Sequence, residues 1–356
     1  MPDSPKPKRR WYQYSIRSLL VLTTLVAFAC SWYASEMKKA AKRRAAVARV
    51  LELRGFVDPY GVYDKQPGWF SFPRRIHGDQ HMGIVFSAWI NDTNLTDADM
   101  AHLGELTTLE ELNIGGTIIS DDAMVHLGGL KNLKHLVLKH TKITDAGLTH
   151  LRDLNKLEQL NLSDTQITDA GLGNLQDLAN LKELCIAKTQ ITDAGMVHLN
   201  TLPNLQTLNL GGLEITDAGL AHLGTLKKIE GLVIISPLVT DDGLKHLKGL
   251  TKLKALVLCN APITDAGLVH LKDMTDLRRL VLDGTQVSDD GLSHLKHLMN
   301  LEDLDLHRTR ISDAGLVHLK SLKKLQHLRI DGSQVTPEGK TNLQKSLPKC
   351  DFNPFP

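Results

Sequence analysis

Histidines recur along this chain at one spacing, which makes them the first candidates for chemistry. They lie 24 residues, or a multiple of 24, apart: His102, His126, His150, His198, His222, His246, His270, His294 and His318. A column of imidazoles could bind a transition metal or sense pH. Asn174 and Asn342 occupy the same column, however, and Asn does not titrate. Because His and Asn share side-chain hydrogen bonding, we predict that the column satisfies backbone groups.

A second arrangement combines carboxylates with an imidazole. Asp283, His307 and Asp331 follow one another at the same 24-residue spacing, as a zinc site could. Arginines surround them in the sequence, at Arg279, Arg308, Arg310 and Arg329. Opposite charges at this density favour a solvated network of ion pairs. We therefore predict ion pairs here, and neither a metal nor another cofactor.

The sequence motifs of enzymes are absent or incomplete. Gly339-Lys340-Thr341 resembles the end of a phosphate-binding loop, but the earlier glycine of that motif would fall at Gln334. The chain contains no G-x-S-x-G, H-E-x-x-H or kinase signature. Its four cysteines form no C-x-x-C pair, and Cys185 and Cys259 lie three repeats apart, too far for a disulfide. The sequence predicts a protein that is not an enzyme.

All these candidates belong to one repeating unit. An aliphatic residue opens a near-copy of the phrase I-T-D-A-G-L every 24 residues, without insertion or deletion. The opening residues are Leu95, Ile119, Ile143, Ile167, Ile191, Ile215, Val239, Ile263, Val287, Ile311 and Val335. A strict period of this length is typical of a solenoid, in which each unit buries its apolar face against its neighbours.

The order of residues inside one unit predicts its elements. In the unit that begins at Ile263, Thr264 is placed to cap a short helix and Asp265 to complement the positive end of its dipole. The pattern L-x-x-L-x-L from Leu277 to Leu282 then predicts a short strand. One short helix and one short parallel strand per unit is the leucine-rich-repeat plan.

Copies of L-x-x-L-x-L-x-x-(T/S)-x-(I/V) from Leu109 to Val335, after a degenerate copy at Val85–Leu95, resemble the leucine-rich-repeat family. The resemblance implies an α/β solenoid of 24-residue repeats, with parallel strands on the concave face and short helices on the convex face. Family members most often carry Asn at the ladder position, where this chain has hydroxyls such as Thr117 and Ser333. A hydroxyl can still donate to a neighbouring carbonyl.

The whole layout is also similar to membrane-anchored leucine-rich-repeat proteins predicted from planctomycete-type bacterial genomes. The similarity lies in the S-I-R-S-L-L opening of the apolar segment, in A-V-A-R-V-L-E-L-R-G and in the T-P-E-G and L-P-K-C terminal phrases. It implies a bacterial protein held at the membrane and brings no established activity.

The N-terminal segment carries its own signals. Residues 1–54 hold twelve Lys and Arg against three Asp and Glu, a net +9, which leaves −7 for the rest within the total of +2. The uncharged apolar run 18–34 can span a bilayer and has Trp11 and Trp32 near its two ends. We predict a single-pass anchor in the cell membrane, with cleavage after Ala29 as the alternative. Basic residues before the run favour an extracytoplasmic repeat domain, and the acidic body argues against nucleic acid.

The sequence predicts six segments: a basic tail (1–17), the transmembrane anchor (18–34), a basic helical stalk (35–54), an N-terminal cap (55–83), the solenoid (84–335) and a C-terminal cap (336–356). The stalk has a second interpretation, as a helix that lies on anionic lipid head groups. The aromatic, proline-containing cap segment has one as well, as a binding element of its own.

Residues that point outward from the strands differ along the predicted concave face. An early polar zone contains Glu111, Asn113, His135, Lys139, His140, Gln159, Asn161 and Asp164. An apolar zone follows, made of Gly231, Val233, Ile235, Ala255, Val257, Cys259 and Val281. Beside it the hydroxyl column is broken by Leu213, Pro237 and Ala261. A late charged zone contains Arg279, Asp283, Asp303, Asp305, His307, Arg308, Arg310, His327, Arg329 and Asp331.

Contiguous apolar surface in a polar array is typical of an interaction site, although drift of the repeat would also produce it. We predict a non-enzymatic scaffold that binds a protein partner at the apolar zone and at Arg279, Asp305, His307 and Arg329 of the charged zone. The alternatives are a structural or self-associating envelope protein, a glycan-binding protein, and an accessory module for an enzyme encoded elsewhere.

Overall fold

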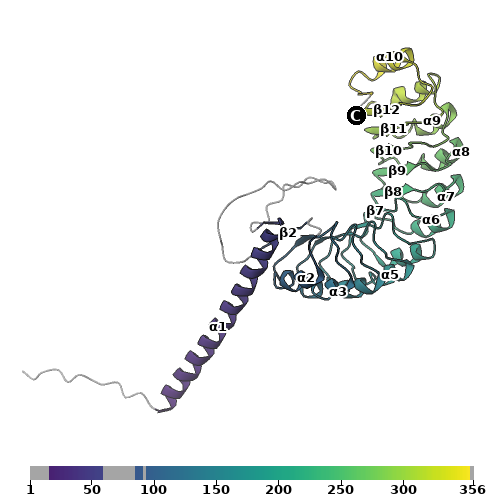
Figure 1. The fold of residues 1–356 in the computed structure, drawn as a ribbon. Helices are drawn as coiled ribbons and strands as arrows, with labels where there is room; N and C mark the ends of the chain where they lie inside the picture. Colours follow the sequence, from purple (N-terminus) through teal and green to yellow (C-terminus); the bar gives the residue numbers. More distant parts are fainter. Residues whose placement is uncertain (1–15, 59–84, 91–93, 353–356) are drawn as a thin grey trace, which may run out of the picture.

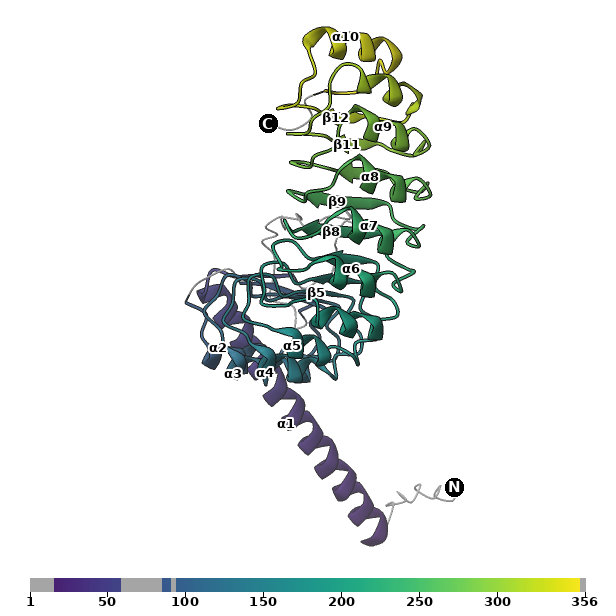
Figure 2. The same ribbon diagram turned by 90° about the vertical axis from the view of Figure 1, so that its right-hand side faces the viewer.

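The computed structural model describes residues 16–58, 85–90 and 94–352. The repeats form a curved solenoid, with strands along the inner side of the curve and short helices along the outer side (Figure 1). The outer helices of the later repeats face the reader in Figure 2, where the strands lie behind them. A long helix, α1, leaves the first repeat and extends away from the solenoid.

One sheet runs through all the repeats. Its twelve strands are ordered as in the sequence, and each strand from β2 on pairs in parallel with the next, whereas β1 is antiparallel to β2. Paired residues are 24 apart, as in Arg279 opposite Asp303. The strands are β1 (Phe56–Asp58), β2 (Ser87–Trp89), β3 (Glu111–Asn113), β4 (His135–Val137), β5 (Gln159–Asn161), β6 (Glu183–Cys185), β7 (Thr207–Asn209), β8 (Gly231–Ile235), β9 (Ala255–Cys259), β10 (Arg279–Val281), β11 (Asp303–Asp305) and β12 (His327–Arg329).

Short α-helices and 3-10 helices return the chain between strands. The α-helices are α1 (Ile16–Glu52), α2 (Asp97–Leu103), α3 (Asp121–Met124), α4 (Asp145–Leu148), α5 (Asp169–Gly173), α6 (Asp217–Leu223), α7 (Asp241–Leu247), α8 (Asp265–Leu268), α9 (Asp289–Leu295) and α10 (Pro337–Ser346). The 3-10 helices are η1 (Leu127–Gly129), η2 (Thr149–Leu151), η3 (Gly195–Thr201), η4 (Val269–Leu271) and η5 (Gly315–Ser321).

The core is a continuous stack of aliphatic side chains between strands and helices. In the unit that begins at Ile263, the side chains of Leu268, Leu271, Leu280 and Leu282 are fully buried. The middle residue of each three-residue strand points into this core, which leaves its two neighbours on the concave face. Burial of each such side chain contributes about 1.5–3 kcal/mol. This stack explains why the apolar positions recur without exception.

The polar residues of the repeated phrase join each unit to the next. An Asp accepts hydrogen bonds from both the backbone N–H and the hydroxyl of the Thr or Ser that opens the following phrase. The pairs are Asp97–Ser120, Asp121–Thr144, Asp145–Thr168, Asp169–Thr192, Asp193–Thr216, Asp217–Thr240, Asp241–Thr264, Asp265–Ser288, Asp289–Ser312 and Asp313–Thr336. The conserved spacing of Thr and Asp along the chain is therefore a row of links between repeats.

The first repeat has no repeat before it, and its link is replaced. Asp99 stands where the next phrase has Ala123 and all later ones have Gly, and it accepts hydrogen bonds from the backbone N–H of Thr96 at 3.0 Å and from its hydroxyl at 2.9 Å. Asp99 also accepts from Nε of Arg49 on α1 at 2.8 Å. The end of α1 thus occupies the place of a preceding repeat.

Both open ends of the core are covered. At the N-terminal end, Ala46 and Val50 from the last turns of α1, and Leu53 directly after it, join the core. Of the predicted cap segment 55–83, Phe56–Asp58 forms β1, and most of the remainder lies outside the described residues. At the far end, Leu343, Leu347 and Cys350 close the core, and Asp351 bonds to the free edge of β12.

Helix α1 is continuous across the predicted anchor and stalk. Its stretch Leu20–Glu52 contains an 18-residue window with a mean hydropathy of 1.3, which is long and apolar enough to cross a membrane. Large apolar side chains on several sides of it are exposed, including Leu22, Val26, Phe28 and Trp32. The basic tail 1–17 lies almost wholly outside the described residues.

Candidate binding surface on the concave face

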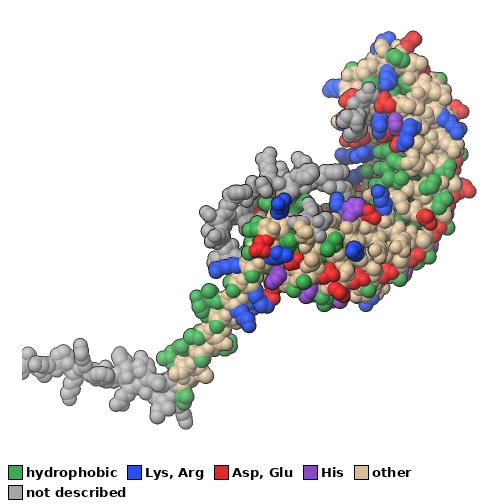
Figure 3. Space-filling model, in the orientation of Figure 1, with side chains coloured by type: hydrophobic (Ala, Val, Ile, Leu, Met, Phe, Trp, Pro, Cys, Tyr) green, Lys and Arg blue, Asp and Glu red, His purple; other side chains and the backbone are tan. Residues whose placement is uncertain are grey.

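The register of the sheet brings the apolar zone together. Val233 pairs with Val257, and Val257 pairs with Val281, so the three side chains form one row across β8, β9 and β10. Gly231 and Ala255 form the adjacent row, which continues into Arg279. Ile235 and Cys259 form a third row. Apolar side chains gather at the level of these strands in the space-filling view, between patches of charge (Figure 3).

All members of the apolar zone are half-buried except Val281, which was expected to point outward and is only 8% exposed. Val281 lies in a shallow hollow lined by the longer side chains of Arg279, Asp305 and Arg329. These neighbours cover much of it. The outward-facing apolar surface therefore consists mainly of Val233, Val257 and Ile235.

The apolar zone coincides with a local change in the strands. In β3, β5 and β7 the last residue is an Asn whose side-chain oxygen accepts from the backbone N–H two residues later, as Asn209 does from Gly211 at 2.9 Å. Val233 and Val257 replace that Asn in the next two repeats and cannot accept such a bond. There the two strands continue pairing as far as Ile235 and Cys259.

The break in the hydroxyl column has a structural account. Thr hydroxyls in this column donate to the carbonyl three residues earlier in their own repeat, as Thr285 does to Leu282 at 2.7 Å. They therefore close the turn after each strand and form no ladder between repeats. Leu213 and Ala261 are buried in place of a Thr. At Pro237, the preceding Ser236 is buried instead and donates to the Ile215 carbonyl at 2.8 Å.

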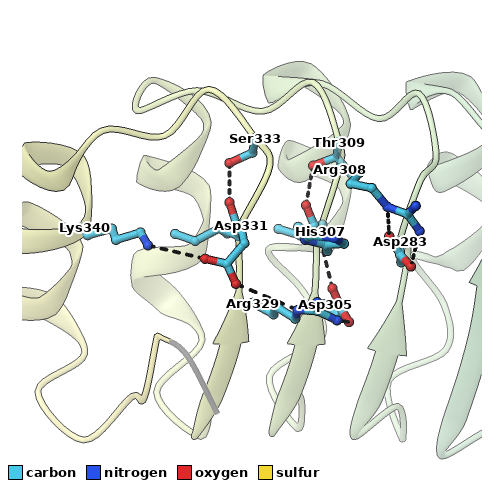
Figure 4. Close-up of polar contacts among 11 residues, drawn as sticks. Asp283, Asp305, His307, Arg308, Thr309, Arg329, Asp331, Ser333 and Lys340 are labelled. Carbon is cyan, nitrogen blue, oxygen red and sulfur yellow. Dashed lines mark hydrogen bonds and ion pairs between the residues drawn. The ribbon is translucent and has the colours of Figure 1, made fainter. Parts of the chain in front are cut away.

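The charged zone is a set of ion pairs between neighbouring strands (Figure 4). Arg308 donates from Nε and Nη2 to the two carboxylate oxygens of Asp283, at 2.9 and 2.7 Å. Arg329 lies 3.5 Å from Asp305 and 3.8 Å from Asp331, which also faces Lys340. The column of Asp283, His307 and Asp331 thus contains the predicted ion pairs.

The contacts of His307 differ from those of a metal ligand. The acidic oxygen beside it, Oδ1 of Asp305, accepts from its backbone N–H at 2.8 Å, and its ring Nδ1 is buried without a hydrogen-bond partner. Within the described ranges, no group of three or more His, Cys, Asp or Glu side chains is arranged to hold a metal ion.

Two groups, one in the apolar zone and one in the charged zone, have pKa values shifted from their ordinary ones. Burial, together with the negative charges of Asp283 and Asp305, raises the pKa of the Cys259 thiol to about 11. The hydrogen bond and charge of Asp283 raise the pKa of Arg308. Cys259 is therefore a neutral, weakly nucleophilic side chain at neutral pH and contributes to the apolar zone as such.

The histidine column does not carry the backbone bonds that we predicted for it. Its rings are partly exposed on the convex side, and no described member of the nine donates or accepts a side-chain hydrogen bond. Asn174 does make the expected bond, from its side-chain nitrogen to the Asp145 carbonyl at 3.1 Å. A ring at the edge of solvent is hydrated without such a bond, which is why the prediction fails for His.

Comparison with known proteins agrees with this geometry. Residues 107–167 match the family model described as leucine rich repeat, whereas no curated protein matches the chain. An internalin from Listeria monocytogenes is 23% identical, with 72% of this chain and 83% of that chain covered and a TM-score of 0.51. A leucine-rich-repeat protein from Leptospira interrogans is 21% identical, with 71% and 62% covered and a TM-score of 0.52.

The chain folds as a leucine-rich-repeat solenoid. The predicted α/β class, the strands on the concave face and the long apolar N-terminal helix are thereby confirmed. Leucine-rich-repeat proteins typically act in protein binding, and solenoid curvature gives them an extended concave surface for it. In this leucine-rich-repeat solenoid, that surface holds the apolar zone of β8 to β10, which continues into the charged zone through β10 and β11.

Sequence reasoning missed the residues that join the repeats. It assigned Asp265 to the helix dipole, although the carboxylate accepts from Ser288 of the next repeat. A signal was available, because a Gly stands 26 residues after nearly every such Asp. A Cβ at that Gly would collide with the Asp carboxylate, as at Gly291 and Asp265.

Proposed function

We propose that this chain is a membrane-tethered, non-enzymatic scaffold that captures a protein partner on its concave face. The main support for this proposal is one row of side chains across the sheet. It contains Val233, Val257 and Val281 and continues directly into Asp305 and Arg329. Tight protein interfaces combine a desolvated apolar centre with a polar rim, and this row supplies both on adjacent strands. A rigid stack of repeats presents them without rearrangement.

The tether in this proposal is α1, whose exposed apolar side chains have no protein surface to cover them within the described residues. In this proposal the chain is a bacterial single-pass membrane protein whose repeats lie outside the cytoplasm. The last turns of α1 are part of the solenoid core, so the tether would hold the repeats at a fixed distance from the bilayer. Between Trp32 and Ala46, fourteen residues of helix span about 21 Å.

The test uses the full chain in detergent or lipid nanodiscs. Partners would first be identified by proximity labelling from the repeats in intact cells, and protease shaving would fix the side on which the repeats lie. Val233→Asp and Val257→Asp should each weaken capture of the labelled partner by about 30-fold or more, as for a central hot spot. Thermal unfolding should confirm that both variants fold.

Val137→Asp is the matched control, because Val137 occupies the same row on β4, in the early polar zone. Capture should survive this change. Equal loss in all three variants, or retained capture in the Val233 and Val257 variants, would exclude the apolar zone as the binding site. Self-association that is lost in the same two variants would instead favour the structural alternative.

A further inference from the structure

Arg279 differs from Arg308, Arg310 and Arg329, the other arginines of the charged zone, whose side chains have hydrogen-bond or ion-pair partners. It is exposed at the start of β10, directly beside Ala255 of the apolar zone in the sheet register. Within the described part of the chain, its guanidinium forms no ion pair and no hydrogen bond, although Asp303 is its partner in the register. Arg279 is thus a permanently charged donor at the border of the apolar zone.

The carboxylates around Arg279 are already engaged. Asp303 bonds to the ring of His327, Asp305 faces Arg329, and Asp283 is held by both nitrogens of Arg308. Each of these carboxylates therefore already has a partner side chain, whereas the guanidinium of Arg279 has none among the described residues. A carboxylate of a bound partner would supply the ion pair that Arg279 lacks.

We infer that the concave site binds an extended acidic peptide, with one carboxylate on Arg279 and an adjacent apolar side chain on Val233 and Val257. This inference rests on the proposed function and names the chemistry of the partner. A guanidinium binds a carboxylate through two parallel N–H bonds, which gives both strength and direction.

The spacing of the surface fits an extended peptide. Neighbouring strands lie about 4.8 Å apart, so the surface from Arg279 to Gly231 covers two strand spacings. In an extended peptide, side chains two residues apart point to the same side and are about 7 Å apart. A Glu and an apolar residue two positions away can therefore reach Arg279 and the Val233–Val257 row together.

The surface suits a peptide better than a sugar. The exposed residues beside Arg279 are aliphatic or small, and β8, β9 and β10 contain no aromatic ring on which a sugar could stack. Gly231 and Ala255 project little above the sheet, which leaves room for a bulky apolar side chain of the partner. The hollow that contains Val281 adjoins the same guanidinium.

A phage-displayed library of random linear peptides, selected on the full-length chain in nanodiscs, tests this inference. Selected peptides should be enriched in Asp or Glu two positions from Leu, Ile, Val or Phe. Arg279→Gln should weaken their binding by about tenfold or more, and Arg279→Glu should shift a new selection toward Lys and Arg.

Arg278→Gln is the matched control, because Arg278 carries the same charge one residue earlier but faces Glu302 at 3.8 Å. It should leave the selected peptides bound. Circular dichroism and thermal unfolding of the Arg279 variants would show that the fold is intact.

The possible failures are distinguishable. Peptides that lose binding in Val233→Asp and Val257→Asp but not in Arg279→Gln would overturn this inference and leave the proposed function standing. A selection whose peptides are indifferent to all three changes would contradict both. Polygalacturonate, an acidic polysaccharide, is the last probe, and its Arg279-dependent binding in place of any peptide would overturn the assignment to a peptide.

Discussion

The carboxylate of Asp241 accepts two hydrogen bonds from Thr264 in the next repeat, from the backbone N–H at 2.8 Å and from the hydroxyl at 2.6 Å. The same hydroxyl accepts from the N–H of Ala266 and so caps α8. One side chain therefore starts a helix and also fastens it to the preceding repeat. Because each repeat of a solenoid contacts only its neighbours, such links act directly on the coupling between units.

Loss of the hydroxyl should uncouple two repeats. Thr264→Val keeps the shape of the side chain and the backbone N–H bond to Asp241, but it removes the hydroxyl's bond to Asp241 and the cap of α8. Bonds to charged groups contribute about 1.5–3 kcal/mol, so we expect a loss of that size in the free energy of unfolding. Denaturant unfolding of the full chain would measure it. Thr264→Ser is the control and should cost little, since Ser288 and Ser312 make the same link.

The glycine of the phrase should be essential for a steric reason. Ala is normally better than Gly inside a helix by about 0.5–1 kcal/mol. A Cβ at Gly267 would collide with the Asp241 carboxylate, so Gly267→Ala should instead destabilise the protein, by about 1–3 kcal/mol. In a double-mutant cycle, Asp241→Ala should relieve most of that cost. Gly173→Ala, whose Cβ would meet only ordinary contacts with His198, should not destabilise.

The sequence predicts the solenoid because its period is a direct consequence of stacking, and the core leucines follow from that period alone. It also predicts which side chains lie on the concave face, since strand alternation decides this for Val233 and Val257. The sequence does not predict features that depend on how side chains of neighbouring repeats contact one another. The burial of Val281 is set by arginine side chains, and the role of Ser236 by the proline after it.

The ion pairs, too, are only partly predictable from the sequence. Charge density around Asp283 predicts pairing, but the sequence cannot say that Arg308 takes both of its oxygens or that Arg279 is left over. Those outcomes depend on side-chain reach across strands. The sequence does not predict the role of Asp99 either. Its departure from the repeat is explained only by its hydrogen bond with Arg49 of α1.

The apolar part of α1 should hold the chain in membranes. Leu25 is exposed in the middle of the apolar run, and Leu51 is exposed on the same helix beyond it. An Arg at the centre of a spanning helix costs about 2.5–3.5 kcal/mol on insertion scales, so Leu25→Arg should shift the chain toward the soluble fraction after alkaline extraction. Leu51→Arg should remain in the membrane fraction. Equal behaviour of the two variants would contradict a spanning role for this run.

The junction between α1 and the first repeat should weaken in acid. Burial alone would raise the pKa of Asp99, but the hydrogen bonds from Arg49 and Thr96 and the charge of Arg49 outweigh it and lower that pKa. A lowered folded-state pKa means that the carboxylate stabilises the junction at pH values above its ordinary pKa of about 4. This contribution is lost as the pH falls through the folded-state value. Hydrogen exchange of residues 46–53, corrected for its intrinsic pH dependence, should therefore accelerate below about pH 4. Asp99→Asn should exchange faster at neutral pH and lose most of the acid response. An acid response of the same size in that variant would assign it to another group, with the Lys42–Glu105 pair as the next to test.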